Sequence, residues 1–275
     1  MHVVNVVFGR VFDVLLLPFS RMTPWAGLVF IALLTSFFML FVYRHTSNQA
    51  GIRRTKDRIK AHLLELRLYN DNMAVSLRAQ GRILLQNLRY LVYNLKPLLV
   101  MIVPIVLILA QLNLRYGSAP LRPGEETLIK VELAAGVDPM ETDLSLEASG
   151  AVAVETPPVR IPEEGEVSWR LRAKEPGPAS LRFTGGGLSL DKDVTVGGSP
   201  LAKVSARRVG RSILDQALYP GEAPLPGGGP VRSIEILYPA RRLSVLGLGV
   251  NWLVGYFILS MIFGFGLKGV FKVEI

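Results

Sequence analysis

The sequence contains no cysteine, and its 275 residues include only three histidines, His2, His45 and His62. The lack of cysteine excludes disulfides, thiolate metal sites and a cysteine nucleophile. Charged residues are also scarce, at 19% of the chain, where a soluble protein averages about 25%. These shortages argue against metal or cofactor chemistry, so we expect no cofactor, no metal site and no enzymatic activity.

Hydrophobic residues make up 50% of the chain, and the mean hydropathy is +0.36. So much apolar surface excludes a disordered protein. Three uncharged runs, 25–43, 97–114 and 243–267, are long enough to be membrane spans. The first covers about 28 Å as a helix, close to the hydrocarbon thickness of about 30 Å. We predict three transmembrane helices and expect Pro104 to kink the second.

The net charge of +9 is concentrated in one segment. Residues 44–96 contain 11 Lys or Arg and three acidic residues, whereas residues 114–240 contain 14 Lys or Arg and 17 acidic residues. By the positive-inside rule the basic segment is cytoplasmic. The N-terminus and residues 115–242 then lie outside, and the tail 268–275 lies inside. Arg241 and Arg242 oppose this orientation, but 11 basic residues outweigh two.

Residues 1–20 form a separate amphipathic pattern. His2, Asn5, Gly9, Arg10 and Asp13 fall on one side of a helical wheel, and valine, leucine and phenylalanine cover the rest. This pattern predicts a helix that lies in the outer membrane interface. A cleaved signal peptide is the alternative, but Arg10 and Asp13 interrupt its apolar region and no A-x-A site follows.

The basic segment predicts a helical hairpin, with helices over 50–69 and 74–95 and a turn at 70–72, which reads Asn-Asp-Asn. Apolar residues recur at helical spacing in both halves, and we expect the two stripes to be buried against each other. The stripes comprise Ile52, Ile59, Leu63 and Leu66 in the first helix and Met73, Leu77, Leu84, Leu88, Leu91 and Leu95 in the second.

The outer faces of this coiled-coil-like hairpin carry the basic residues, of which the candidate contact residues are Arg53, Arg54, Lys56, Arg58, Lys60, Arg78 and Arg82. Three roles stay open for them. They could contact anionic lipid headgroups, meet ribosomal RNA through its phosphates, or only set topology and solubility. Sequence-specific nucleic-acid binding is not expected, because no aromatic stacking platform accompanies the charges.

Residues 115–242 predict an extracytoplasmic, all-β sandwich-like domain. Strands are expected over 127–133, 166–173, 179–184, 188–196, 203–208 and 231–237. In 166–173, Val167, Trp169 and Leu171 alternate with polar residues, and Gly185 to Gly187 predict a hairpin turn between two strands. The domain has no histidine, and its glycine runs lack the Lys-Ser/Thr of a phosphate loop. We therefore expect a domain for binding or packing.

Polar and small residues within the spans are the candidate functional positions. The candidate groove residues are Thr35, Ser36, Gln111, Asn113 and Asn251, with Arg115 at the edge of the second span. The candidate helix-packing residues are Gly247, Gly255, Ser260 and Gly264. One interpretation is close helix contact and hydrogen bonding between helices. The other is a hydrophilic groove, open to lipid, in which a passing polypeptide finds polar partners.

Three stretches carry a resemblance to a known family: FVYRHTSNQAGIRRTKDRIKAHLLELRLYNDN (41–72), RAQGRILLQNLRYLVYNLKPLLVMIVPIVLILAQL (78–112) and NWLVGYFILSMIFGF (251–265). With an outer interfacial helix, a span and a basic hairpin, this layout resembles the YidC/Oxa/Alb insertase superfamily. It is closer to the reduced three-span members, such as archaeal YidC-like proteins. The added β domain and the lack of Lys or Arg inside the spans depart from the bacterial members.

The resemblance implies a membrane insertase or assembly factor of the prokaryotic plasma membrane. It implies a groove for short translocated segments and a hairpin that receives them. The expected partners are membrane lipids, nascent membrane proteins, the ribosome and a partner membrane subunit, and no DNA. The alternative is a non-catalytic membrane scaffold or sensor whose β domain binds an external partner.

Overall fold

The computed structural model describes residues 1–69, 73–185, 188–245 and 247–274. The chain divides into two compact units. The first unit, which we call the β unit, comprises Met1–Gly27 and Val106–Trp252, and the second, the helical unit, comprises Leu28–Ile105 and Leu253–Ile275. A helical part and a β domain are thus both present, as the sequence predicts.

Helices α2 (Pro24–Thr46), α3 (Gln49–Leu68), α4 (Met73–Tyr116) and α6 (Trp252–Leu267) supply the helical unit. By length and composition, α2, α4 and the N-terminal segment His2–Phe19 could each cross a membrane. The last of these consists of α1 (His2–Leu16) and the short 3-10 helix η1 (Leu17–Phe19). The structure therefore confirms a helix at each of the first two expected spans and at the N-terminus.

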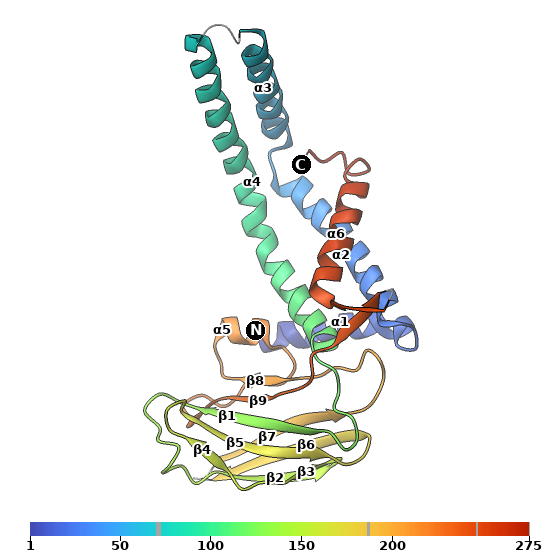
Figure 1. Ribbon diagram of the computed structural model, residues 1–275, viewed down its shortest axis with the longest axis vertical. Helices are drawn as coiled ribbons and strands as arrows, with labels where there is room; N and C mark the ends of the chain where they lie inside the picture. Colours follow the sequence, from blue (N-terminus) through green and yellow to red (C-terminus); the bar gives the residue numbers. More distant parts are fainter. Residues whose placement is uncertain (70–72, 186–187, 246, 275) are drawn as a thin grey trace. The chain divides into compact units, whose positions relative to one another are not determined.

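Helix α4 continues without interruption through the expected boundary between the hairpin and the second span (Figure 1). It comprises 44 residues, and Pro97 and Pro104 both lie inside it, so neither proline ends the helix. Each proline lacks one backbone hydrogen-bond donor, but the long apolar sequence on either side keeps the helical conformation favourable. The predicted turn at 70–72 lies outside the described residues.

The third expected span is shorter than its apolar run. Residues 243–245 and 247–251 are not helical, because β10 (Arg242–Val245) and β11 (Leu248–Asn251) form an antiparallel hairpin and α6 begins only at Trp252. Gly247 has a φ of +85° in the hairpin turn, a conformation that favours glycine. Helix α6 has 16 residues, about 24 Å at 1.5 Å per residue. Gly247 therefore lies outside helix α6, and its predicted role in helix packing is wrong.

The expected burial of the apolar stripe between α3 and α4 is wrong for α4 and holds only in part for α3, where Ile52 is buried, Ile59 and Leu66 are half-buried and Leu63 is exposed. Within residues 49–68 and 73–95, the buried residues are Ile52 and Thr55 on α3 and Ala79 and Gln86 on α4. Arg82 and Glu65 form an ion pair of 3.6 Å across the pair. The expected stripe on α4 is exposed instead at Met73, Leu77, Leu84, Leu88, Leu91 and Leu95.

The reason is that α4 carries two rows of residues at the same alternating spacing of three and four. The row that contains Ala79 and Gln86 is the buried one. A Cβ added to Gly51 of α3 would lie only 3.1 Å from the ring of Tyr93 on α4. The leucine row points elsewhere, and periodicity alone could not show which row meets α3. We call Leu77, Leu84, Leu88, Leu91 and Leu95 the leucine row.

The β unit contains two sheets that share one core (Figure 1). The larger sheet has the order β3-β5-β1-β9-β8, with β4 also paired to β5, and the smaller has the order β2-β6-β7. The strands of the larger sheet are β1 (Glu126–Leu133), β3 (Val152–Val154), β4 (Val159–Ile161), β5 (Glu166–Ala173), β8 (Arg207–Val209) and β9 (Val231–Ile236). Those of the smaller sheet are β2 (Ser145–Gly150), β6 (Gly177–Gly185) and β7 (Leu188–Val196).

The core lies between the sheets, where Trp169 of β5 meets Phe183 of β6 edge to face at 5.7 Å. Trp169 and Leu171 are buried and Arg170 and Arg172 are exposed, as strand alternation requires. Five of the six predicted strands are confirmed over most of their length. The exception is 203–208, where only Arg207 and Arg208 belong to a strand, because the Ser205 carbonyl accepts a side-chain hydrogen bond from Lys192 instead.

Strands β6 and β7 pair antiparallel as far as Gly185 opposite Leu188, as expected for a hairpin, while Gly186 and Gly187 lie outside the described residues. A Cβ at Gly185 would lie 1.7 Å from the carbonyl oxygen of Asp143, so only glycine fits there. The short elements β2, β3, β4 and α5 (Ile213–Leu218) were not predicted, because their sequences have little alternation or length.

Two leucines on paired strands give a matched test of this core. Leu171 is fully buried, whereas Leu128 on the neighbouring strand is 40% exposed. We expect Leu171→Ala to lower the free energy of unfolding by about 2–5 kcal/mol, and Leu128→Ala to lower it by about 1 kcal/mol or less. Pulse proteolysis of the full-length protein in detergent, over a urea series, measures both. Equal losses would contradict the assignment of the core.

Candidate functional site

A cavity of about 340 Å³ lies within the helical unit, between α2, α4 and α6. Its polar edge is formed by Thr35 and Ser36 from α2 and by Tyr256 and Ser260 from α6. Met39, Leu40, Met101, Ile105 and Phe257 are among the apolar residues that line the rest. The cavity therefore combines an apolar wall with a short row of hydroxyl groups.

The hydroxyl groups differ in how they are satisfied. The Ser36 hydroxyl donates to the Ala32 carbonyl at 2.8 Å and approaches the Ser260 carbonyl at 3.2 Å. The Ser260 hydroxyl is buried and has no hydrogen-bond partner among the described residues. The Tyr256 hydroxyl also approaches the Thr35 and Ser260 hydroxyls, so the hydroxyl groups face one another and the surface of the cavity is mainly apolar.

The four helix-packing candidates have different surroundings. Ser260 and Gly264 line the cavity, and a Cβ added to Gly264 would meet nothing within 4 Å. The small size of Gly264 thus leaves the cavity open and does not bring two helices into close contact. Gly255 is buried on α6, in keeping with the predicted packing role.

The remaining groove candidates belong to the β unit. Gln111 is buried, and its side-chain nitrogen donates to the Asn5 carbonyl of α1 at 3.5 Å. Arg115 is only 2% exposed; its guanidinium donates to the Gln111 carbonyl at 3.1 Å and pairs with Asp13 of α1. These contacts attach α1 to the C-terminal end of α4, so Gln111 and Arg115 have a structural role in this arrangement.

Asn113 and Asn251 are exposed. Asn113 lies near the end of α4 and Asn251 at the end of β11. Of the six groove candidates, Thr35 and Ser36 are therefore the two that line the cavity. Sequence reasoning missed Tyr256 and Met101, because an aromatic residue or a methionine within an apolar run resembles any other core residue.

The predicted hairpin contact residues are mostly exposed, at Arg53, Arg54, Arg58, Lys60, Arg78 and Arg82. Lys56 is half-buried and forms an ion pair of 3.6 Å with Glu274. Arg53 and Lys56 also line a second pocket together with the segment after α6. The other basic residues present an open cationic surface on α3 and on the N-terminal half of α4.

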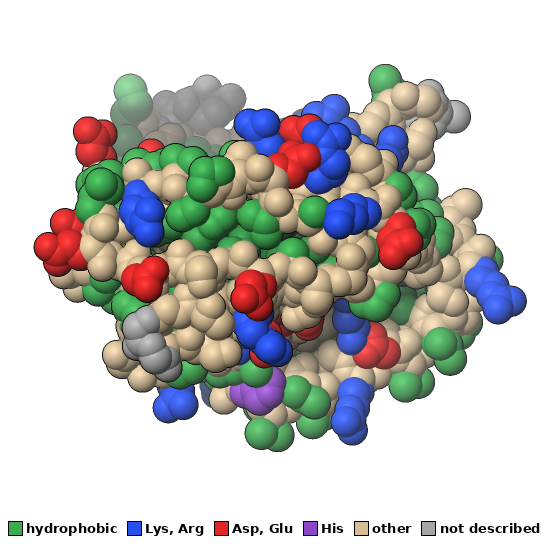
Figure 2. Space-filling view, turned by 90° about the horizontal axis from the view of Figure 1, so that it is seen from below, with side chains coloured by type: hydrophobic (Ala, Val, Ile, Leu, Met, Phe, Trp, Pro, Cys, Tyr) green, Lys and Arg blue, Asp and Glu red, His purple; other side chains and the backbone are tan. Residues whose placement is uncertain are grey.

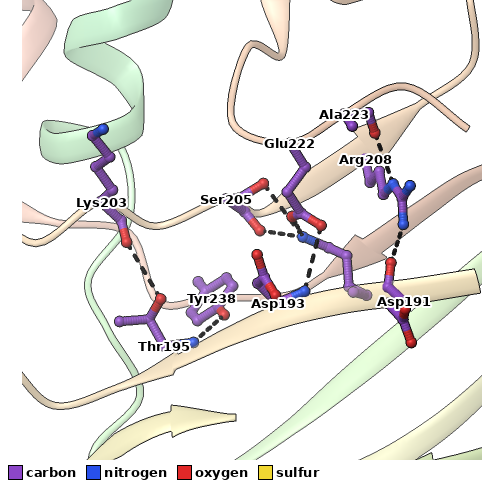
Figure 3. Close-up of polar contacts among 10 residues, drawn as sticks. Asp191, Asp193, Thr195, Lys203, Ser205, Arg208, Glu222, Ala223 and Tyr238 are labelled. Carbon is purple, nitrogen blue, oxygen red and sulfur yellow. Dashed lines mark hydrogen bonds and ion pairs between the residues drawn. The ribbon is translucent and has the colours of Figure 1, made fainter. Parts of the chain in front are cut away.

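The β unit contains a buried ionic cluster (Figure 3). The side chain of Lys192 has no exposed surface, and its ammonium group donates to the Glu222 carboxylate and to the Ser205 carbonyl. Burial lowers the pKa of Lys192, and the Glu222 charge opposes that shift. The Tyr238 hydroxyl accepts a hydrogen bond from the Thr195 amide at 3.0 Å, and burial raises the pKa of Tyr238.

This cluster is satisfied internally and has no open position. Arg208 extends it by donating to the Asp191 and Ala223 carbonyls. In the part of the chain that the structure describes, no group of three or more His, Asp or Glu side chains could hold a metal ion. The cluster therefore links β7 to the segments around Ser205 and Glu222, and it has the character of a structural ion pair.

The surface of the β unit carries charges of both signs. Arg172 pairs with Glu126 and Glu155, and Glu132 pairs with Arg207 and Arg232. On the face shown in Figure 2, acidic and basic side chains are interspersed with apolar ones. A nucleic-acid surface would be predominantly basic, and this surface carries both signs of charge.

No protein-family model matches the chain, and no curated protein matches it. A solved structure of the S-layer protein SbsC, domains 4 and 5, is similar over 29% of this chain, with 13% identity and a TM-score of 0.24. The match covers 47% of that structure, about half its length. A likeness this small carries no argument. The class of protein is therefore defined by the structure itself: long apolar helices combined with a β domain of two sheets.

The buried Lys192–Glu222 pair gives a testable prediction. Glu222→Gln leaves the ammonium group buried without a counter-charge, and we expect it to lower the free energy of unfolding by about 3–5 kcal/mol. The double variant Lys192→Met/Glu222→Gln removes both charges and should recover most of that loss. Pulse proteolysis of the full-length protein measures both variants. A double variant as unstable as the single one would show that the ion pair itself is not the source of the effect.

Proposed function

We propose that this protein is an integral membrane protein of the YidC/Oxa/Alb type that assists the insertion or assembly of other membrane proteins. The observation that carries the proposal is the cavity edged by Thr35, Ser36, Tyr256 and Ser260 among apolar helices. The basic hairpin of α3 and α4 belongs to the same unit. The resemblance of three sequence stretches to this superfamily supports the same reading.

The cavity would act by lowering the cost of taking a short polar segment out of water. A polar group without a partner in an apolar medium costs several kcal/mol. The hydroxyl groups of Thr35, Ser36, Tyr256 and Ser260 along one wall would supply partners. The apolar wall accommodates the hydrophobic part of the same segment. No nucleotide and no covalent intermediate is needed for this process.

In the proposed topology the basic hairpin is cytoplasmic and the β domain is extracytoplasmic, within a prokaryotic plasma membrane. The 11 basic residues between positions 44 and 96 support this orientation. The hairpin would receive nascent membrane proteins, from the ribosome or a partner membrane subunit, and the β domain would contact an external partner. Membrane lipids surround the apolar helices.

A second candidate is a non-catalytic membrane scaffold or sensor. The observation in its favour is the leucine row, which is exposed along α4 although it repeats at the spacing of a coiled-coil seam. A stable partner helix could cover this row, and the β domain could bind a further partner outside. In this case the cavity would have no substrate.

Photo-crosslinking in cells separates the two candidates. We expect probes at Ser260 and Met101, which line the cavity, to capture short-lived nascent membrane proteins. Matched probes at Ile262 and Val103, which are exposed, should capture lipid or nothing. The crosslinks are identified by mass spectrometry, with and without a block of translation. Crosslinks to one stable protein that persist after the block would favour the scaffold and contradict the insertase.

A substitution that fills the cavity tests its role directly. Ser260→Leu removes the buried hydroxyl and occupies cavity volume, and we expect about a tenfold or greater loss in insertion of a substrate with a polar translocated segment, equivalent to about 1.4 kcal/mol. Val254→Leu, at an exposed position on the same helix, is the control. Proteoliposome insertion measures both, and thermal unfolding confirms that each variant is folded. Full activity in Ser260→Leu would refute the cavity as the substrate site.

A further inference from the structure

A second pocket in the helical unit has a volume of about 570 Å³ and is unlike the first in chemistry. It lies where the first two turns of α3 meet the segment that follows α6. Four basic side chains line it: Arg53 and Lys56 from α3, and Lys268 and Lys272 from the segment after α6. Glu274 is the one acidic residue in its lining.

The segment after α6 is held in place by its apolar residues. Phe271 and Val273 are buried against Leu40 of α2, and Phe271 meets the ring of Phe37 edge to face at 4.8 Å. The amide of Glu274 donates to the side-chain oxygen of Gln49 at 2.7 Å. The pocket is therefore built by packing between distant parts of the sequence and not by a loose tail.

Lys272 lies between the two buried apolar residues and has a φ of +50°. A non-glycine residue in this conformation is uncommon and persists where the surroundings impose it. The packing of Phe271 and Val273 fixes the backbone on both sides, so the lysine side chain is directed to the pocket. The Lys268 side chain has a contact of its own, because its ammonium group lies 5.4 Å from the centre of the Phe265 ring.

The electrostatics of the pocket favour an anion. Four cationic groups face one carboxylate, and that carboxylate already pairs with Lys56 at 3.6 Å. The N-terminus of α3, at Gln49 and Ala50, adds the positive end of a helix dipole of 20 residues. The pocket therefore retains an excess of positive charge that a phosphate group would neutralise.

The position of the pocket along the chain indicates the source of that phosphate. Helix α2 ends at Thr46 and α6 ends at Leu267, so the pocket begins within a few residues of the ends of two apolar helices. Membrane lipids place their phosphate groups at this level, and basic pockets between such helices bind anionic headgroups. We propose that the pocket of Arg53, Lys56, Lys268 and Lys272 binds the phosphate headgroup of an anionic membrane lipid. The proposal does not depend on insertase activity.

Native mass spectrometry of the full-length protein in detergent tests this assignment. The ligands are phosphatidylglycerol, phosphatidylcholine with the same acyl chains, inorganic phosphate and a structured RNA hairpin. We expect phosphatidylglycerol to bind most tightly, and Lys268→Gln/Lys272→Gln to weaken it about thirtyfold, the loss expected for two basic residues near an anionic surface. Arg67→Gln/Arg89→Gln, which removes two exposed charges from α3 and α4 outside the pocket, should stay within about twofold of the wild type.

A variant expected to bind more tightly distinguishes loss of the pocket from a folding defect in the lysine double variant. Glu274→Gln removes the acidic side chain and keeps the backbone contact to Gln49, so it should bind phosphatidylglycerol about fivefold more tightly. Equal weakening by the two double variants would refute the pocket and indicate diffuse surface charge. Tight binding of phosphate alone or of RNA, without preference for phosphatidylglycerol, would also overturn the lipid assignment, as would unchanged binding in Glu274→Gln.

Discussion

A charge that leaves water must meet an opposite charge, and this constraint is visible in every part of the structure. Arg115 is almost completely buried at the end of α4, and it pairs with Asp13 of α1. Lys192 is completely buried in the β unit, and it pairs with Glu222. Each pair joins segments that are far apart in sequence, since an isolated buried charge would be prohibitively costly. The fully uncharged stretch of α2 and the whole of α6 satisfy the same constraint by excluding charge altogether.

The same constraint separates the two pockets of the helical unit by chemistry. The cavity between α2, α4 and α6 contains hydroxyl groups, which can be buried at moderate cost, and no ionised side chain. The second pocket begins where the apolar helices end, and there four basic side chains gather around a single carboxylate. The hydroxyl groups thus lie among the apolar helices, and the basic side chains lie beyond the ends of those helices.

Helix α4 shows how one sequence can contain two possible interfaces. Its row with Ala79 and Gln86 is buried beside α3, while the leucine row is exposed at the same spacing. The less hydrophobic row is the buried one, and Tyr93 of α4 reaches Gly51 of α3. Hydrophobicity alone favours the other row. The exposed leucines remain available for a neighbour in the bilayer or the cytoplasm.

Several features of the fold could be predicted because they depend on local pattern. The uncharged run at α2, the amphipathic α1, the helices of the hairpin and the strands β1, β5, β6, β7 and β9 all follow from periodicity and composition. The run 243–251 could not be assigned in this way, because a short apolar run can form either a strand or a helix. In the structure, the positive φ of Gly247 allows the turn that joins β10 to β11.

The sequence by itself determined the class of the protein: apolar helices, a basic segment between two of them and a β domain. Only the tertiary structure decided which polar residues act together. It placed Thr35 and Ser36 beside Tyr256 and Ser260, assigned Gln111 and Arg115 to the attachment of α1, and brought Lys268 and Lys272 to Arg53 and Lys56. Such groupings join residues separated by some 100 to 220 positions, and no local pattern encodes contacts over that range. They depend on packing, which is a property of the folded chain.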